Sequence, residues 1–262
     1  MSLAFREPVE NRLGALCAAV GQTVQVAAAA FCGLPGMLWR QRSRQVFYRQ
    51  LYVAGIGTLP VATVVALFTG MILSLQLGIA FRQFSQELMV AYTLTFAMFR
   101  EMGPFMTGIL LASCVGSAMA AQLGTMTVDE EVAALEMMGV NPIRFLVVPR
   151  FWAMTCMAPL LSFYTCLIAF FGGALVGYTQ LNIPFLQFFR QLVEAAELKD
   201  LYVGLFKAMC FGMLICSISC TVGFAATQGA SGVGAATRRA VILSFLSILI
   251  GGYFITRFFY AL

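Results

Sequence analysis

Histidine is absent from this 262-residue chain, and lysine occurs only as Lys199 and Lys207. Without histidine the chain cannot build a Ser-His-Asp triad, a zincin motif or an imidazole pH switch. Neither lysine follows the G-x-x-x-x-G pattern of a phosphate-binding loop. The chain therefore lacks the means to hydrolyse ATP in that manner, and we expect no cofactor in it.

Charge is also scarce. Only 10% of the residues are charged and 61% are hydrophobic, whereas a soluble domain carries about 25% charged residues. This composition predicts an integral membrane protein that forms one compact helical bundle. The net charge of +5 does not indicate nucleic-acid binding, because the bases flank apolar segments. No basic stretch followed by a short apolar core and an A-x-A site opens the chain, so we expect no cleavable signal.

The chain has no C-x-x-C pair. Its eight cysteines all lie in apolar segments, which favours small packing residues over disulfides or metal ligands. Two of them, Cys216 and Cys220, share a helix face, but they have no histidine or nearby acid to complete a zinc site. The others are Cys17, Cys32, Cys114, Cys156, Cys166 and Cys210.

Long apolar runs dominate what is present. They predict an all-α polytopic membrane protein with five transmembrane spans, at residues 51–80, 88–123, 151–180, 201–227 and 240–261. The first span would reach about 45 Å, more than the hydrocarbon core of about 30 Å, so it must tilt or bend. Pro60 and Gly70 are the expected bends.

Two segments are less apolar. Residues 13–38 are alanine-rich and interrupted by Gln22, Gln25 and Pro35, which favours a helix lying in the membrane interface over a sixth span. Residues 227–239 are rich in glycine, serine and threonine and predict a connector.

The distribution of bases predicts the orientation. With the N-terminus inside, the cytoplasmic side collects ten arginines, against four or five bases on the far side, a clear positive-inside bias. The ten are Arg6, Arg12, Arg40, Arg42, Arg44, Arg49, Arg144, Arg150, Arg238 and Arg239.

A polar stretch at residues 124–150 would then lie in the cytoplasm. Thr127 followed by Glu130 matches a capping box, so we expect a helix over residues 127–139 that ends at Gly139 and Asn141-Pro142. Four acids cover most of its surface: Asp129, Glu130, Glu131 and Glu136. An ordinary connector resting on the membrane is one interpretation. The acids favour a protein partner instead, because anionic lipid attracts bases.

The run LGTMTVDEEVAALEMMGVNPIRFLVVPRFWA resembles the signature of MlaE-type permeases, the membrane subunits of ABC transporters that move phospholipids between bacterial membranes. The similarity continues through RQLYVAGIGTLPVATVVALFTGMILSLQ and LTFAMFREMGPFMTGILLASCVGSAMAAQ, and covers most of the chain from about Arg49. The resemblance implies an inner-membrane permease that maintains outer-membrane lipid asymmetry.

The resemblance also implies partners and sites. The acidic helix would be the coupling helix that docks into a cytoplasmic ATPase, with Thr127 and the four acids at the contact, and ATP and Mg²⁺ would bind that ATPase. Further partners would be a periplasmic MCE-domain hexamer and a small STAS-domain protein. Leu73, Phe81 and Phe84 occupy the positions of a lipid-binding lining. Cys114 stands where such permeases commonly carry arginine, and a thiol cannot contact phosphate as arginine does.

Arg100 and Glu101 lie near the middle of the second predicted span, where a charge costs about 3 kcal/mol. Adjacent helical residues point about 100° apart, so we expect each to have its own partner: a second protomer, water or a ligand. A buried structural pair is the alternative to a place on the lipid path. Gly103 and Pro104 could act as a hinge that opens the helix beside them.

An odd number of spans without matching halves favours a homodimer around the transport path. Two other function classes stay open. A proton- or ion-coupled secondary transporter could use Glu101 as its carrier, and a membrane scaffold without transport could use the acidic helix only for docking.

Overall fold

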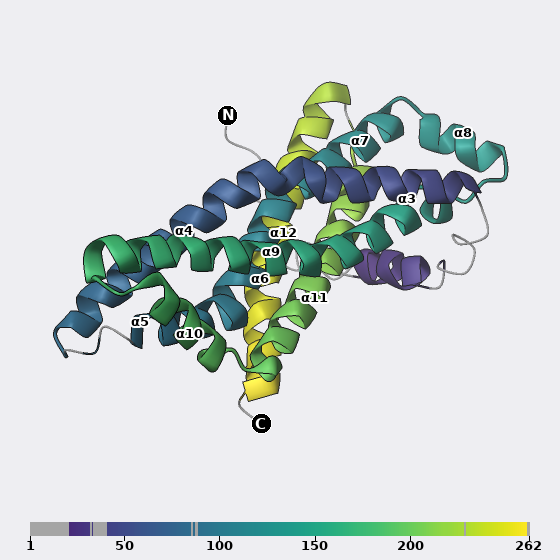
Figure 1. The fold of residues 1–262 in the computed structure, drawn as a ribbon. Coiled ribbons are helices and arrows are strands. Elements are labelled where there is room, and N and C mark those ends of the chain that lie inside the picture. The colour runs from purple at the N-terminus through teal and green to yellow at the C-terminus, as the bar shows by residue number, and fades with distance from the viewer. Residues whose placement is uncertain are drawn as a thin grey trace, which may run out of the picture.

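The computed structural model describes residues 21–31, 33, 41–84, 86, 89–227 and 229–260. This part of the chain is helical and contains no strand (Figure 1). The labelled elements are α3 (Gln41–Ala54), η1 (Ile56–Thr58), α4 (Leu59–Arg82), α5 (Met89–Ala97), η2 (Met98–Met102), α6 (Gly103–Leu111), η3 (Ala112–Gly116), α7 (Ser117–Val128), α8 (Glu131–Met137), η4 (Ile143–Val147), α9 (Val148–Leu181), α10 (Phe185–Ala195), α11 (Leu198–Phe224) and α12 (Gly229–Tyr260).

Five helical stretches are long and apolar enough to cross a membrane: Gln45–Arg82, Met89–Val128, Ile143–Leu181, Leu198–Phe224 and Gly229–Tyr260. The prediction of an all-α polytopic membrane protein with five spans is therefore confirmed. In the second and third stretches, the π-helical segments η2, η3 and η4 adjoin α-helix without a break in the helical path.

The helices extend beyond the predicted spans mainly at two places. α12 begins at Gly229, inside the stretch predicted as a connector, because its first turns pack on α7: a Cβ on Gly124 would lie 3.5 Å from Val233. The third stretch begins at Ile143 rather than near residue 151. The Asn141 side chain accepts hydrogen bonds from the amides of Ile143 and Arg144, at 3.0 and 3.3 Å. Asn141-Pro142 thus starts a helix, whereas α8 ends earlier, at Met137, before Gly139 in the left-handed conformation with φ 73°.

The first stretch is interrupted at Gly55 to Thr58, where the 3₁₀ segment η1 separates α3 from α4. Pro60 is the second residue of α4 and has no N–H, so the α-helical hydrogen bonding is interrupted just before the place where a bend is predicted. Gly70 lies inside the uninterrupted helix α4 at a close contact with α9, where an added Cβ would approach the Ala169 carbonyl oxygen to 1.9 Å.

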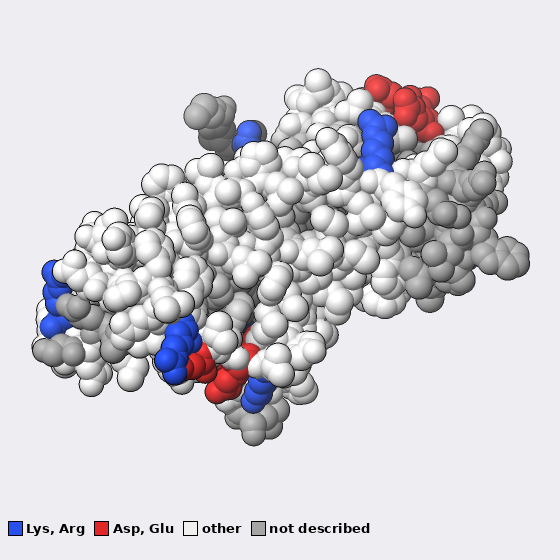
Figure 2. All heavy atoms as spheres, in the orientation of Figure 1, with Lys and Arg blue, Asp and Glu red and all other residues white. Residues whose placement is uncertain are grey.

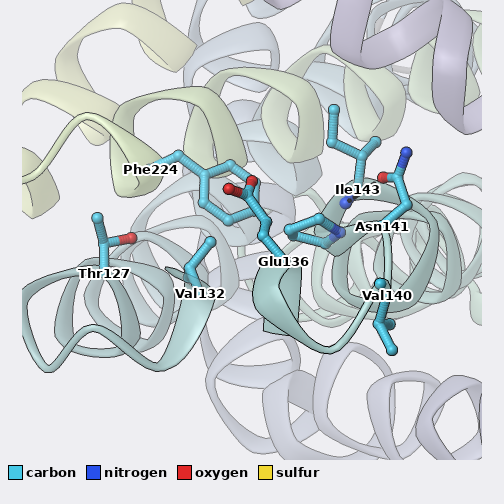
Figure 3. A pocket seen from close by; sticks show the side chains of 9 residues that line it. Thr127, Val132, Glu136, Val140, Asn141, Ile143 and Phe224 are labelled. Atoms are coloured by element: carbon cyan, nitrogen blue, oxygen red, sulfur yellow. Dashed lines mark hydrogen bonds between the residues drawn. The ribbon is translucent and has the colours of Figure 1, made fainter. Parts of the chain in front are cut away.

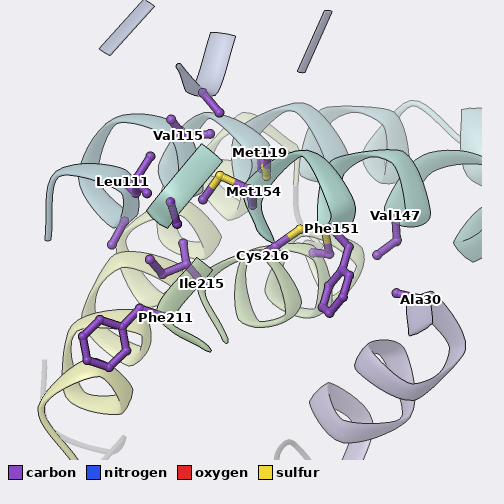
Figure 4. Close-up of a cluster of buried hydrophobic side chains, with 14 of the residues drawn as sticks. Ala30, Leu111, Val115, Met119, Val147, Phe151, Met154, Phe211, Ile215 and Cys216 are labelled. Atoms are coloured by element: carbon purple, nitrogen blue, oxygen red, sulfur yellow. Dashed lines mark hydrogen bonds between the residues drawn. The ribbon is translucent and has the colours of Figure 1, made fainter. Parts of the chain in front are cut away.

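Small residues bring the spans together. The buried positions of α4 recur every four residues and form one stripe: Ala62, Ala66, Gly70, Ser74 and Gly78. The larger core cluster gathers side chains from α6, η3, α7, α9 and α11, among them Leu111, Met119, Phe151, Phe211 and Ile215 (Figure 4). Outward faces of α4 and α12 carry exposed Phe, Ile and Leu instead, as expected of surfaces that meet lipid.

The predicted interfacial helix, residues 13–38, falls largely outside the described residues. Residues 21–31 within it are helical. This piece packs on α9, where the Trp152 indole donates a hydrogen bond to the Ala30 carbonyl at 3.2 Å and Phe31 lies edge-on to Phe151.

Charged side chains gather toward two ends of the visible face, with uncharged surface between them (Figure 2). One group is the acidic patch over α8. The other lies at the opposite end, where α11 begins and α12 ends (Figure 1).

Candidate functional site

Glu101 and Lys207 form an ion pair between η2 and α11. The Lys207 ammonium lies 2.8 Å from Glu101 Oε1, 2.9 Å from the Arg100 carbonyl oxygen and 2.6 Å from Thr256 Oγ1 of α12. A lysine has three donors, so all three are used. Lys207 is only 1% exposed, and this full set of acceptors is what makes a buried ammonium tolerable.

The proline explains why the Arg100 carbonyl needs a lysine. In an α-helix this oxygen would accept from the amide four residues later, but that residue is Pro104, which has no N–H. The chain turns there as the π-helix η2, in which the Gly103 amide donates to the Met98 carbonyl. The helix continues through Gly103 and Pro104 and is not broken there. Gly103-Pro104 thus leaves the Arg100 carbonyl oxygen without its α-helical amide donor, and the Lys207 ammonium donates to it instead.

A second ion pair joins Arg100 to Asp200, the third residue of α11. Arg100 Nε lies 2.8 Å from Asp200 Oδ2; the N–H does not point along this line, so the contact is an ion pair rather than an aligned hydrogen bond. The guanidinium also lies between the rings of Phe96 and Tyr260, at 4.3 and 4.5 Å from their centroids. The Tyr260 hydroxyl donates to Asp200 Oδ1 at 2.6 Å.

Together these residues form a charge network, defined by Arg100, Glu101, Asp200, Lys207, Thr256 and Tyr260. It carries two positive and two negative groups, so its formal charge is zero. Asp200 and Lys207 are buried, whereas the side chains of Arg100 and Glu101 keep 34% and 46% of their surface exposed. The exposed members are thus the ones able to meet a second protomer or a ligand.

Two expectations about these charges need correction. Each residue does have its own partner, but the partners come from α11 and α12 of the same chain. The network also lies toward one end of the bundle, because Arg100 contacts the first turn of α11 and the last residue of α12. Asp200 and Lys207 are seven residues apart and therefore share a helix face. That spacing, together with a lysine inside an apolar span, was the available signal.

The residues predicted as a lipid lining separate into two groups. Leu73 and Phe81 are partly buried and pack against the smaller core cluster, which also contains Phe99 of η2. Phe84, just beyond α4, is 72% exposed. Cys114 is exposed in η3, and its sulfur lies 3.9 Å from the Ser113 hydroxyl. Their roles in lipid binding stay predictions.

The acidic helix differs from the predicted capping box. α7 runs through Thr127 to Val128, and the Thr127 hydroxyl donates back to the Leu123 carbonyl at 2.8 Å. α8 begins only at Glu131, after Glu130 in the left-handed conformation with φ 60°. The helix therefore has seven residues, about two turns, and the capping box is wrong because continued helix hydrogen bonding used the threonine instead.

α8 is nevertheless a projecting, acid-rich surface. No residue of α8 is buried, and Asp129, Glu130, Glu131 and Glu136 are all exposed. Met137 and Met138 beside them are 86% and 68% exposed. Flexible methionines next to charge suit a protein contact.

A pocket of about 640 Å³ lies behind α8. Glu136 and Val132 of α8, Thr127 of α7 and Phe224 at the end of α11 line it, with the Glu136 carboxylate and the Phe224 ring facing the same space (Figure 3). Of the predicted contact residues, Thr127 and Glu136 therefore line the pocket, and Asp129, Glu130 and Glu131 do not. A shift of α8 would change this pocket directly.

Comparison with known proteins agrees with this architecture. Residues 47–258 match the Permease MlaE family. A probable ABC transporter permease protein of Rickettsia typhi is 35% identical over 95% of this chain and 96% of its own. A probable ABC transporter permease protein of Synechocystis is 33% identical over 82% and 81%. The intermembrane phospholipid transport system permease protein MlaE of Haemophilus influenzae is 32% identical over 77% of each chain. The chain belongs to the MlaE permease family and is an ABC transporter permease.

Proposed function

We propose that this permease moves phospholipids between the inner membrane and a periplasmic MCE-domain hexamer, and so maintains outer-membrane lipid asymmetry. The observation that carries this proposal is the charge network: Arg100 and Glu101 of η2, each in an ion pair with α11, stay partly exposed toward one end of a bundle with an apolar core. A phospholipid presents the matching chemistry, a charged headgroup joined to acyl chains. The name of the Haemophilus influenzae relative, an intermembrane phospholipid transport system permease, supports the same cargo.

In this proposal Arg100 and Glu101 meet the headgroup, while Leu73, Phe81 and Phe84 line the route of the acyl chains. Asp200 and Lys207 hold the two contact residues in place from α11. A headgroup phosphate that approaches Arg100 competes with Asp200 for the guanidinium. Binding and release would then be exchanges between ion pairs, which avoid leaving a charge unpaired in the bundle.

Transport is powered by a cytoplasmic ATPase that binds ATP and Mg²⁺. This ATPase docks on α8 of each protomer of a homodimer. α8 follows α7 within two residues, and α7, η3, α6 and η2 form one continuous helical stretch. A displacement of α8 can therefore reach η2 along a stiff path. The N-terminus is cytoplasmic in this arrangement, and a STAS-domain protein completes the assembly.

Charge reversal tests the docking face. Glu130→Lys with Glu131→Lys should abolish co-purification of the ATPase, because both acids are exposed beside α8. The matched control is Glu194→Lys with Glu197→Lys, two exposed acids at the opposite end, which should leave the complex intact. A complex that survives the first change, or is lost equally with the second, contradicts the docking surface.

A transport assay tests the cargo and separates the alternatives. Proteoliposomes containing the permease and its ATPase should transfer labelled phospholipid to MCE-domain acceptor protein only with ATP. Transfer driven by a proton or ion gradient without ATP would identify a secondary transporter. A complex without transfer, bound lipid or stimulated ATPase would identify a scaffold. The first result would refute ATP-driven transport, and the second would refute phospholipid transport altogether.

A further inference from the structure

The helix α10 lies between the third and fourth candidate spans, and its surface has three distinct faces. At about 100° per residue, Phe188, Leu192 and Ala195 form the face buried against the bundle. Leu186, Phe189 and Val193 form an exposed apolar stripe, with 86%, 39% and 74% of their surfaces exposed.

The third face of α10 is polar. Gln187, Arg190 and Glu194 are exposed, and Arg190 Nε lies 3.0 Å from Glu194 Oε1 across one turn. The centres of the three faces are separated by roughly 100 to 130° on the helical wheel. Packing on the protein therefore explains one face only and leaves an apolar face and a charged face side by side.

Contacts with α9 fix how α10 lies. The Phe188 ring packs on Gly177, where an added Cβ would come within 3.0 Å of it. The Phe185 ring stacks on Tyr178 with centroids 4.9 Å apart, and Tyr178 is itself 56% exposed. Tyr178 and Phe171 are seven residues apart and both exposed, so this stack joins α10 to an outward apolar face of α9.

We propose that α10 is an interfacial helix whose stripe of Leu186, Phe189 and Val193 is seated among the acyl chains of the leaflet opposite α8. α10 connects the end of α9 to the start of α11 (Figure 1), so it lies at the level where two spans leave the membrane. A protein-facing side, a lipid-facing side and a water-facing side are what that position requires. Arg190 and Glu194 would lie at the headgroup level.

This seating has a consequence for the charge network. Only Ala196 and Glu197 separate α10 from α11, and the Asp200 amide donates to the Glu197 carbonyl at 3.1 Å. The depth of α10 in the leaflet therefore sets the position of the first turn of α11, which holds Asp200 against Arg100. The lipid surface is a positioning partner of the network, whatever molecule the permease carries.

Tryptophan quenching in vesicles tests the seating. Val193→Trp and Gln187→Trp are made in the full chain, and the emission of the unsubstituted chain, which contains two tryptophans, is subtracted. In phosphatidylcholine–phosphatidylglycerol vesicles, Trp at 193 should be quenched by acyl-brominated lipid and shielded from iodide, and Trp at 187 should show the reverse. Leu186→Trp should behave like the variant at 193.

Quenching at 193 by iodide would place the stripe in water, and insensitivity to both quenchers would show that protein covers it. Either result overturns the proposal. Because the readout contains no transport step, it can succeed while phospholipid transfer fails, and the reverse is also possible. The two proposals are therefore tested separately.

Discussion

Removing the Lys207 ammonium should destabilise the permease far more than removing the other lysine. Lys207→Met preserves the length of the apolar stem but deletes three donors. Glu101 then loses its cation, and the Arg100 carbonyl loses a donor that Pro104 cannot replace. The free energy of unfolding should fall as it does when one partner of a buried ion pair is removed.

Such removals cost about 3–5 kcal/mol. The lower end, about 3 kcal/mol, applies because the Glu101 side chain retains 46% of its surface and can be partly solvated. For a chain of this size 1 kcal/mol corresponds to about 2–4 °C, so the Tm should fall by roughly 6–12 °C. Thermal unfolding in lipid nanodiscs, followed by intrinsic fluorescence, measures this shift.

Lys199→Met is the matched control. Lys199 is exposed, and its ammonium lies 5.3 Å from the Tyr260 ring centroid, a contact worth about 0.5–1 kcal/mol. Adding Glu101→Gln to Lys207→Met should recover part of the loss, because no uncompensated charge then remains. A shift below about 2 °C for Lys207→Met, or effects of Glu101 and Lys207 changes that simply add, would refute the network.

Other substitutions test the packing of α4 on α9 and the contacts of Asp200 and Tyr260 in the charge network. Gly70→Ala should cost about 1–3 kcal/mol in thermal unfolding, because its Cβ would meet backbone of α9 at 1.9 Å, whereas Gly57→Ala meets its nearest atom at 3.8 Å and should be near neutral. Asp200→Asn should lower the Tm by removing the carboxylate that faces Arg100; an equal effect of Glu197→Gln, an exposed acid, would contradict this assignment. Tyr260→Phe retains the ring over the guanidinium and should cost only the hydroxyl bond to Asp200, about 1.5–3 kcal/mol; an unchanged Tm would remove that bond from the account.

The number and type of spans could be predicted from sequence because hydropathy is a local property. The ends of the helices could not, because tertiary contacts decide them. The glycine-rich start of α12 has a composition typical of loops, yet packing against Gly124 of α7 holds it helical. Thr127 and Glu130 matched a capping box, but Thr127 lies in the last turn of α7, where its hydroxyl donates to a carbonyl one turn earlier.

In the candidate site too, local sequence predicted some features, and tertiary contacts decided the others. Arg100 and Glu101 were identifiable because charges inside an apolar span are costly. Their partners Asp200 and Lys207 lie 100 or more residues away in sequence and become neighbours only when α11 packs on η2. No local pattern reports that pairing, although the seven-residue spacing places both partners on one helix face.

The most direct test of the account is phospholipid transfer by the variant Glu101→Gln with Lys207→Met. This pair is electrically neutral like the original, so the folded permease and its ATPase complex should persist. The account predicts that ATP-dependent transfer falls more than about tenfold, because a contact between headgroup and charge is worth about 1.5–3 kcal/mol. Transfer at the unmodified rate by a folded, ATPase-bound variant would contradict the claim that these charges lie on the lipid path.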